Sequence, residues 1–426
     1  MESAKSSKKH YAWKVVAACI LIKLGTSGFV SVAMGNFVTP IVNDLGCKVS
    51  QLTMYTSIDA IAMALLYTTA AKWINTKHIG KIMGIASIAE CVGLALMGTY
   101  KTVEMFYFSG ALLGIAQAFT GFVALPIVVN MWFKKNTGTV LGLIVSIGNA
   151  ATMLYSLLSG RLITLFGWRH AYFIMAGASA VVTIIPVFLL IKRPEEVGCL
   201  PYGADESIEL PKSTGAGKMQ KEEMSLSAHQ AFTLPLLYIA WIACVMYSYS
   251  SGVAGYATTF STMELGRSIS FGSVVGVCSS LGGVLSSLIV GRINDKYGVK
   301  KGLLWGSITT VLGYSIMLLS YKNAFFVYPG IFIVGLGSCM YMVQCPLLAR
   351  NIVGSAEYST IWSRMMMVNS LIGGGLYSTI GLFYDKSGTY KGAFLMASAM
   401  YIAAGILGAI SVNKSEKLHQ KLKRNN

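Results

Sequence analysis

The chain has 426 residues, of which 54% are hydrophobic and only 12% are charged. A soluble domain carries about 25% charged residues, so this composition excludes a water-soluble protein and indicates a membrane protein. The net charge of +17 does not indicate nucleic-acid binding, because the basic residues lie between long apolar runs and not along one face of a polar domain.

Apolar stretches that could cross a membrane recur along the whole chain. A spanning helix needs about 20 mostly apolar residues. We predict an all-α membrane protein with twelve such helices, at residues 13–39, 50–74, 79–99, 103–131, 138–166, 170–191, 232–262, 270–293, 300–320, 324–350, 358–383 and 390–412. The first stretch is longer than the apolar core of a signal peptide, so we expect no cleavable signal.

An internal repeat divides these helices into two sets of six. Glycines and prolines recur at one nearly constant offset, which pairs Gly110 with Gly330, Pro126 with Pro346, Gly160 with Gly381, and Gly167 with Gly388. An even number of helices per half gives a parallel repeat. The sequence therefore predicts a six-helix bundle at 1–191, a polar linker at 192–231, a second six-helix bundle at 232–412 and a basic tail at 413–426.

The basic residues predict the orientation of the helices. With the N-terminus inside, 24 lysines and arginines fall in inner segments and 8 in outer segments. Inner loops carry the excess of basic residues in membrane proteins. We therefore expect a multi-pass protein of the cell (plasma or inner) membrane, with both termini and the linker in the cytoplasm.

The loop between helices eight and nine carries the most specific motif. Residues 291–301 read GRINDKYGVKK, which resembles the signature loop of the major facilitator superfamily. The resemblance implies the major facilitator fold, and makes Gly291, Asp295, Lys296 and Gly298 candidates for a conformational latch. Asp295 should face the N-terminus of helix five, near residues 135–138, because a helix N-terminus attracts a carboxylate. The matching loop of the first half has Asn75 in place of the carboxylate.

Three further segments point to a narrower group. They read WFKKNTG at 132–138, GWRHA at 167–171 and PEEVGCLPYG at 194–203. They resemble the oxalate/formate antiporter and monocarboxylate transporter group, whose members move small organic anions. That group commonly has a basic residue in helix eight, whereas residues 270–291 of this chain carry no charge.

Ionisable residues inside predicted spans are candidates for the transport site, because they are costly in lipid. Lys23 and Asp59 lie at nearly the same depth, and Glu90 also lies near the midplane. Asp59 and Glu90 are therefore candidates for proton coupling, with Lys23 meeting an anion once Asp59 is protonated. In the structural alternatives, Lys23 and Asp59 form a static pair, and Glu90 is a neutral, hydrogen-bonded packing residue.

Arg364, in helix eleven, is the candidate for gripping a substrate carboxylate, because a guanidinium can donate two parallel hydrogen bonds. Alternatively, its side chain reaches the cytoplasmic interface. Polar or aromatic residues in other spans could complete a substrate site with Lys23, namely Asn149, Tyr247 and Gln344.

These features favour a secondary active transporter that moves a small organic anion, a monocarboxylate or dicarboxylate, by proton symport or anion exchange. An exporter of drugs or apolar compounds is the alternative, since 22 methionines and many aromatics make adaptable surfaces; a membrane sensor without transport is a third.

No phosphate-binding loop, metal cluster or catalytic constellation stands out, so we expect neither an enzyme nor a cofactor. The eight scattered cysteines read as apolar packing residues. The expected partners are the organic anion, protons in the symport case and the lipid bilayer, but no nucleic acid, and we expect a monomer.

Overall fold

The computed structural model describes residues 10–33, 37–76, 78–204 and 227–425. Most of the expected linker, residues 205–226, therefore lies outside the described residues. The described chain is almost entirely helical, as the apolar spans predict.

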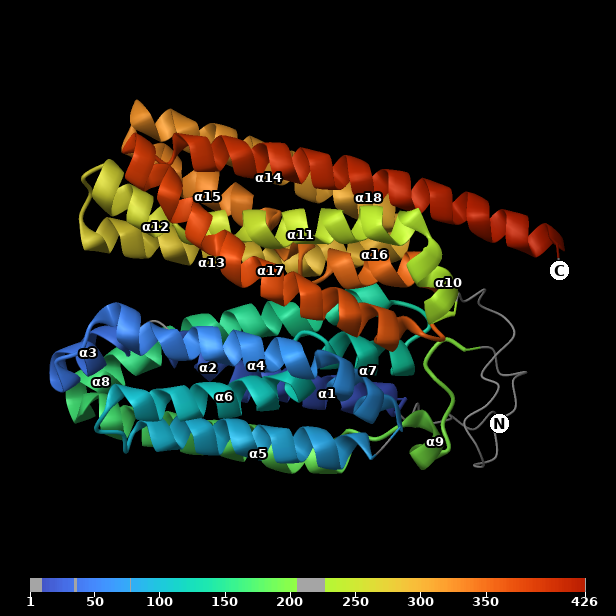
Figure 1. The fold of residues 1–426 in the computed structure, drawn as a ribbon, viewed down its shortest axis with the longest axis horizontal. Helices are drawn as coiled ribbons and strands as arrows, with labels where there is room; N and C mark the ends of the chain where they lie inside the picture. Colours follow the sequence, from blue (N-terminus) through green and yellow to red (C-terminus); the bar gives the residue numbers. More distant parts are fainter. Residues whose placement is uncertain (1–9, 34–36, 77, 205–226, 426) are drawn as a thin grey trace, which may run out of the picture.

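The helices of the first half form one bundle, in the lower part of Figure 1. They are α1 (Ala12–Ile22), the π-helical turn η1 (Lys23–Ser27), α2 (Gly28–Ala33), α3 (Val38–Leu45), α4 (Val49–Thr76), α5 (Ile79–Met97), α6 (Val103–Thr120), α7 (Ala124–Trp132) and α8 (Thr137–Leu190). Short helices α9 (Pro194–Val197) and α10 (Ala228–Thr233) lie between the halves in the sequence.

The second half forms the other bundle, in the upper part of Figure 1. Its elements are α11 (Pro235–Gly255), α12 (Ala257–Thr259), η2 (Phe260–Glu264), α13 (Ile269–Tyr297), α14 (Val299–Leu318), η3 (Leu319–Tyr321), η4 (Ala324–Phe326), α15 (Val327–Leu336), η5 (Ser338–Met340), α16 (Gln344–Val353), α17 (Tyr358–Ser387) and α18 (Lys391–Asn425). The last helix continues through the predicted start of the tail at residue 413.

The helix lengths agree with twelve membrane crossings. Nine segments of the described chain are long and apolar enough to span by length and composition, and one of them is α8, with 54 residues. Gly167 interrupts α8 with φ 76° and ψ 163°, so this element holds two successive spans. Helices α4 and α17 add 28 and 30 residues.

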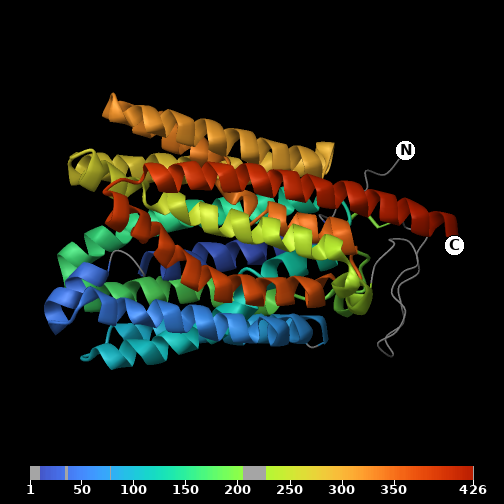
Figure 2. The same cartoon turned by 45° about the horizontal axis from the view of Figure 1, so that its top comes forward.

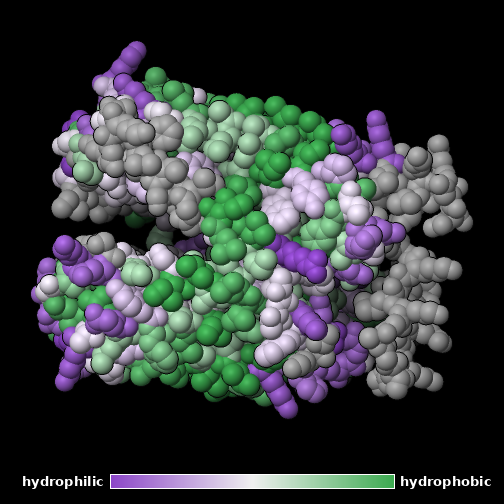
Figure 3. Space-filling view, in the orientation of Figure 1, coloured by the Kyte–Doolittle hydropathy of each residue, from purple (hydrophilic) through white to green (hydrophobic). Residues whose placement is uncertain are grey.

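Large apolar side chains cover the outside of both bundles. Leu165 and Val181, for example, are 71% and 73% exposed. Figure 3 shows hydrophobic residues across the middle of the visible face and hydrophilic residues at its two ends. Lipid accepts such a belt, whereas water would penalise it.

Glycines bring helices of each bundle into close contact. A Cβ on Gly114 would lie 2.2 Å from the carbonyl oxygen of Asp59, which joins α6 to α4. A Cβ on Gly335 would lie 2.7 Å from the carbonyl oxygen of Ser279, which joins α15 to α13. Small residues permit such close packing of membrane helices.

The bundles meet through two pairs of helices, α8 with α13 and α4 with α17. Helix α1 begins, and α18 ends, at the same end of the molecule, which we call the termini end (Figures 1 and 2). The long helices run between this end and the opposite end. Because the long helices run from one end to the other, the residues that face the opposite bundle line the interface between the bundles from end to end.

Candidate functional site

Lys23 lies part-way along the first span, at the start of the π-helical turn η1. It is about 16 Å from the beginning of α1 at 1.5 Å per residue. Its ammonium lies 5.1 Å from the centroid of the Phe122 ring, and its aliphatic chain packs beside Gly148 of α8. No ion pair within 4.0 Å involves Lys23 in the described chain. Single π-helical turns are frequent at functional sites.

The two buried acids are held by α6. Gln117 Nε2 donates to Asp59 Oδ1 at 2.8 Å, and Thr120 Oγ1 donates to Glu90 Oε1. Gln117 and Thr120 are three residues apart and therefore share a face of α6. The predicted ion pair between Lys23 and Asp59 is not formed, because Asp59 turns towards the Gln117 amide.

Glu90 lies in α5, which packs against the π-helical turn that begins at Lys23. Its side chain is completely buried, so its field is poorly screened. Matching depth in the sequence placed Lys23 and both acids in one predicted layer, and which acid acts with Lys23 during transport stays a prediction.

An aromatic contact continues from Lys23 to the second bundle. The Phe122 and Tyr341 rings lie 6.4 Å apart between centroids. The Tyr341 hydroxyl accepts a hydrogen bond from Asn369 Nδ2 at 2.8 Å. The predicted residue Asn149 also faces the other bundle, since its amide nitrogen would lie 3.6 Å from a Cβ on Gly283. This group combines a cation, two rings and two amides between the halves, which could bind a small anion.

Three predicted substrate residues lie away from this group. Arg364 is exposed, and its guanidinium carbon lies 5.2 Å from the centroid of the Phe232 ring in α10. Tyr247 is buried inside the second bundle with its ring 5.2 Å from Tyr401. Gln344 is buried too, and its amide is used by Asn294 and the carbonyl of Val299. In the described conformation, Arg364 therefore matches the interface alternative, and Tyr247 and Gln344 occupy packing positions. A role of these three residues in substrate binding stays a prediction.

The signature loop touches the other bundle as its sequence predicts. Asp295 Oδ1 accepts from the backbone N–H of Gly138 at 2.9 Å, and Oδ2 accepts from that of Thr139 at 2.6 Å. These two amides belong to the first turn of α8, so the carboxylate meets the positive end of the helix dipole. Gly291 lies against Gly138, where a Cβ would be 2.4 Å from the Gly138 oxygen.

The other two residues of the motif act within the second bundle. Gly298 has φ 82° at the junction of α13 and α14, a backbone conformation that favours glycine. The Lys296 ammonium lies 5.2 Å from the ring centroid of its neighbour Tyr297.

The two bundles make further contacts at the termini end, which the sequence did not predict. Arg350 donates to Thr137 Oγ1 and, at 3.3 Å, to the carbonyl oxygen of Phe133. Lys134 Nζ donates to Ser355 Oγ at 3.2 Å. The basic residues at helix ends were the available signal for these contacts, but their partners are far away in the sequence.

The internal repeat places a corresponding contact between the bundles at the matching loop of the first half. Asn75 donates to Ser359 Oγ, and Ser359 lies in the first turn of α17. The offset of the internal repeat relates Asn75 to Asp295 and, to within one position, Gly138 to Ser359. The two loops therefore make equivalent contacts, one with a neutral amide and one with a carboxylate. The bundles touch through these contacts at the termini end.

Comparison with known proteins agrees with this architecture. A family model described as Major Facilitator Superfamily matches residues 19–279 and 239–425. The chain belongs to this superfamily. It is therefore a multi-pass membrane transporter for a small molecule and not an enzyme.

Individual relatives are distant. A protein of Agrobacterium vitis named as a candidate tartrate transporter is 22% identical over 80% of this chain and 77% of its own length. Multidrug resistance protein 2 of Bacillus subtilis is also 22% identical, over 63% of this chain and 66% of its own length. The proton:xylose symporter XylE superposes with a TM-score of 0.72 at 11% identity, over 93% of this chain and 94% of its own. The last likeness concerns the fold.

Proposed function

We propose that this transporter carries a small organic anion, a monocarboxylate or dicarboxylate, by alternating access. The observation that carries the proposal is the position of Lys23, a cation deep in the first span that contacts a ring and forms no ion pair in the described chain. A cation in this setting is costly unless an anion or water compensates it. A substrate carboxylate would supply that charge during transport. The name of the Agrobacterium relative supports an organic anion as the substrate class.

The orientation follows from the positive-inside rule. Basic residues at the termini end include Lys72, Lys81, Arg193 and Lys300, which flank the ends of spans there. We place this end in the cytoplasm of a cell membrane and treat the protein as a monomer. In this orientation, the contacts between the bundles at the termini end close the described conformation to the cytoplasm.

We propose Glu90 as the group that couples protons to the anion. It is buried in α5, which packs against the turn that begins at Lys23, and Thr120 binds it, so it can exchange a proton only when the pathway lets water reach it. A protonated Glu90 leaves the Lys23 charge to the substrate, and a charged Glu90 competes for it. Proton and anion would then move in the same direction.

Reconstituted proteoliposomes test the substrate class. Wild-type protein should accumulate a labelled carboxylate, and Lys23→Gln should reduce uptake by at least tenfold with expression retained. Lys14→Gln is the matched control, because Lys14 is exposed near the start of the same helix. Equal uptake by wild type and Lys23→Gln would remove the organic anion as substrate. Transport of a cationic dye in place of carboxylates would establish the drug-exporter alternative.

The coupling proposal needs a separate variant. Glu90→Gln should abolish accumulation driven by a pH gradient while carboxylate exchange across the membrane continues. Asp59→Asn is the comparison, since Asp59 is bound to Gln117 and not to Lys23. Gradient-driven accumulation that survives Glu90→Gln would contradict the role of Glu90. Uptake that requires internal anion in the wild type would favour exchange over symport.

A further inference from the structure

The segment that follows α8 folds back onto the termini end of the first bundle. We call residues 192–203 the brace; they contain the PEEVGCLPYG sequence, for which transport itself gives no role. The brace passes beside the loop that joins α7 to α8 and ends at Gly203, where a Cβ would lie 2.9 Å from Lys135 Cβ. A segment outside the membrane is thus fitted to the connection between two spans.

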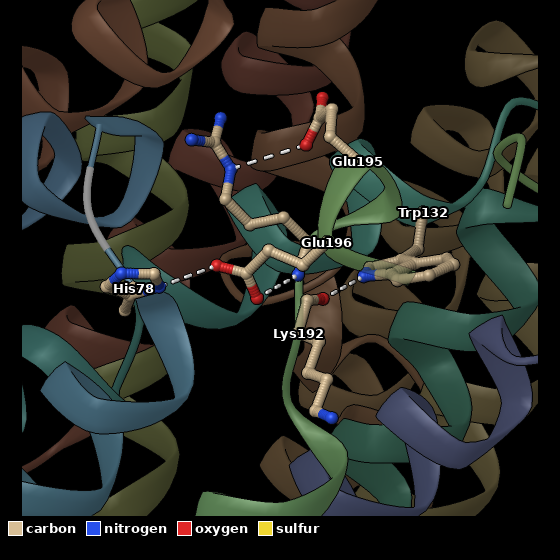
Figure 4. A network of polar contacts seen from close by, with 6 residues as sticks. His78, Trp132, Lys192, Glu195 and Glu196 are labelled. Carbon is tan, nitrogen blue, oxygen red and sulfur yellow. Dashed lines mark hydrogen bonds and ion pairs between the residues drawn. The ribbon is translucent and has the colours of Figure 1, made fainter. Parts of the chain in front are cut away.

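Backbone hydrogen bonds fix the brace to this loop. Tyr202 N–H donates to the carbonyl oxygen of Trp132 at 2.8 Å, and Lys134 N–H donates to that of Tyr202 at 2.9 Å. These two hydrogen bonds form an isolated parallel β-bridge between Phe133 and Tyr202. At the start of the brace, Trp132 Nε1 donates to the Lys192 carbonyl oxygen at 2.8 Å, as Figure 4 shows. The brace therefore holds one backbone edge of the loop and the tryptophan that ends α7.

Aromatic packing strengthens the same attachment. The ring of Tyr202 lies 5.5 Å from Phe133, 5.6 Å from His10 and 6.0 Å from Trp13, between centroids. Such ring pairs contribute beyond their buried area. The Tyr202 ring thereby joins the brace to the beginning of the first span as well as to the loop.

Acidic residues of the brace add weaker contacts. Glu196 Oε1 lies 3.0 Å from His78 Nδ1, and its other oxygen accepts from the backbone N–H of Arg193 at 3.2 Å (Figure 4). Arg193 Nε also lies 3.6 Å from Glu195. His78 is exposed, and exposed pairs contribute little to stability. The hydrogen-bonded bridge and the Tyr202 ring are therefore the main attachments.

The loop held by the brace also contacts the second bundle. Arg350 binds the carbonyl of Phe133, and Lys134 reaches Ser355. Asp295 then binds the first amides of α8, directly after this loop. All three contacts require residues 133–139 to keep one position, and the brace fixes that position from the other side.

We infer that the brace positions the N-terminus of α8 for closure at the termini end, an inference that rests on the alternating-access part of the proposed function. Loosening the brace should free residues 133–136, weaken the Asp295 contact and increase the fraction of molecules open at this end. The brace would thereby link the segment between the two halves to the equilibrium of the transporter.

Spin labels on the two bundles measure this equilibrium without any substrate. Lys81 and Lys301 are exposed near the starts of α5 and α14, and cysteines placed there in a cysteine-free background report the separation of the bundles. Tyr202→Ala keeps the backbone hydrogen bonds and removes the ring, so it should lower the closed-to-open ratio by roughly threefold to tenfold, the effect of about one lost aromatic contact. Tyr202→Phe keeps the ring and should restore the wild-type distribution. Tyr297→Ala is the control, because Tyr297 is exposed at the same end.

A double-mutant cycle shows whether the brace acts through the latch. In an Asp295→Asn background, Tyr202→Ala should produce less than half of its effect in the wild type. If Tyr202→Ala fails to fold, Trp132→Phe removes only one indole donor and should shift the ratio in the same direction, by roughly twofold or more. Unchanged distance distributions, an effect equal to that of Tyr297→Ala, or full additivity with Asp295→Asn would each overturn the inference. Failure of carboxylate uptake would leave these results unaffected.

Discussion

Replacing Gly142 by alanine tests how the two bundles close at the termini end. A Cβ on this residue of α8 would lie 2.1 Å from the carbonyl oxygen of Ser287 in α13, whereas ordinary van der Waals contact begins at 3.4 Å. The two backbones must therefore separate until this shortfall is removed. A backbone oxygen cannot rotate away as a side chain can, so the helices themselves must move apart.

The expected cost follows from the hydrogen bonds nearby. Asp295 is 2.9 Å from the Gly138 nitrogen and 2.6 Å from the Thr139 nitrogen, and lengthening both by the shortfall at Gly142 would take them beyond hydrogen-bonding distance. Each hydrogen bond to a charged group contributes about 1.5–3 kcal/mol. Allowing for partial relaxation, the closed state should lose about 2–4 kcal/mol, a factor of roughly 30 to 1,000 in the closed-to-open ratio.

The spin-label pair at residues 81 and 301 measures this shift. Gly142→Ala should move most molecules to the longer distance, while Gly177→Ala should leave the distribution unchanged, since a Cβ on Gly177 meets nothing within 4 Å. Thermal unfolding measurements should show that both variants remain folded. A folded Gly142→Ala protein with the wild-type distribution would refute the reasoning.

The remaining predictions concern three other side chains. Arg350→Gln should shift the same spin-label distances towards the open state by roughly tenfold, because it removes two hydrogen bonds to the other bundle, whereas the exposed Arg292→Gln should not. Glu264→Gln should lower the thermal unfolding midpoint by a few degrees, about 1–2 kcal/mol, because this carboxylate binds the N-terminus of α18; an equal loss in the exposed Glu104→Gln would contradict this. Arg364→Gln should leave carboxylate uptake within about twofold of wild type, as surface substitutions do, and loss of uptake would return Arg364 to the substrate site.

The sequence was most informative where one local pattern determines the structure. Long apolar runs predicted the helices, and Gly167 separated two spans that the structure shows as one interrupted helix. The signature loop predicted the partner of Asp295, because a carboxylate one helical turn after a close-packing glycine can reach the helix beside it.

The direction of polar side chains within a span could not be predicted in the same way. The spans are apolar on all sides, so no amphipathic pattern tells which face of α17 carries Arg364 or which face of α11 carries Tyr247. A polar residue can be satisfied between helices of one bundle as well as between bundles, as the buried amide of Gln344 is. Gln117 and Thr120, close together in an apolar helix, were the one readable signal for the partners of the buried acids.

The reversal at Gly167 has a mechanical consequence. Its positive φ turns the chain without an intervening loop, so both arms of α8 form a single stiff hairpin. One tip of this hairpin receives Asp295, and the other leads directly into residues 192–203. Because the hairpin is stiff, a displacement of the residues at one tip also displaces the residues at the other tip. Flexible glycines inserted after Gly167 would make the two tips independent while leaving every contact at each tip unchanged.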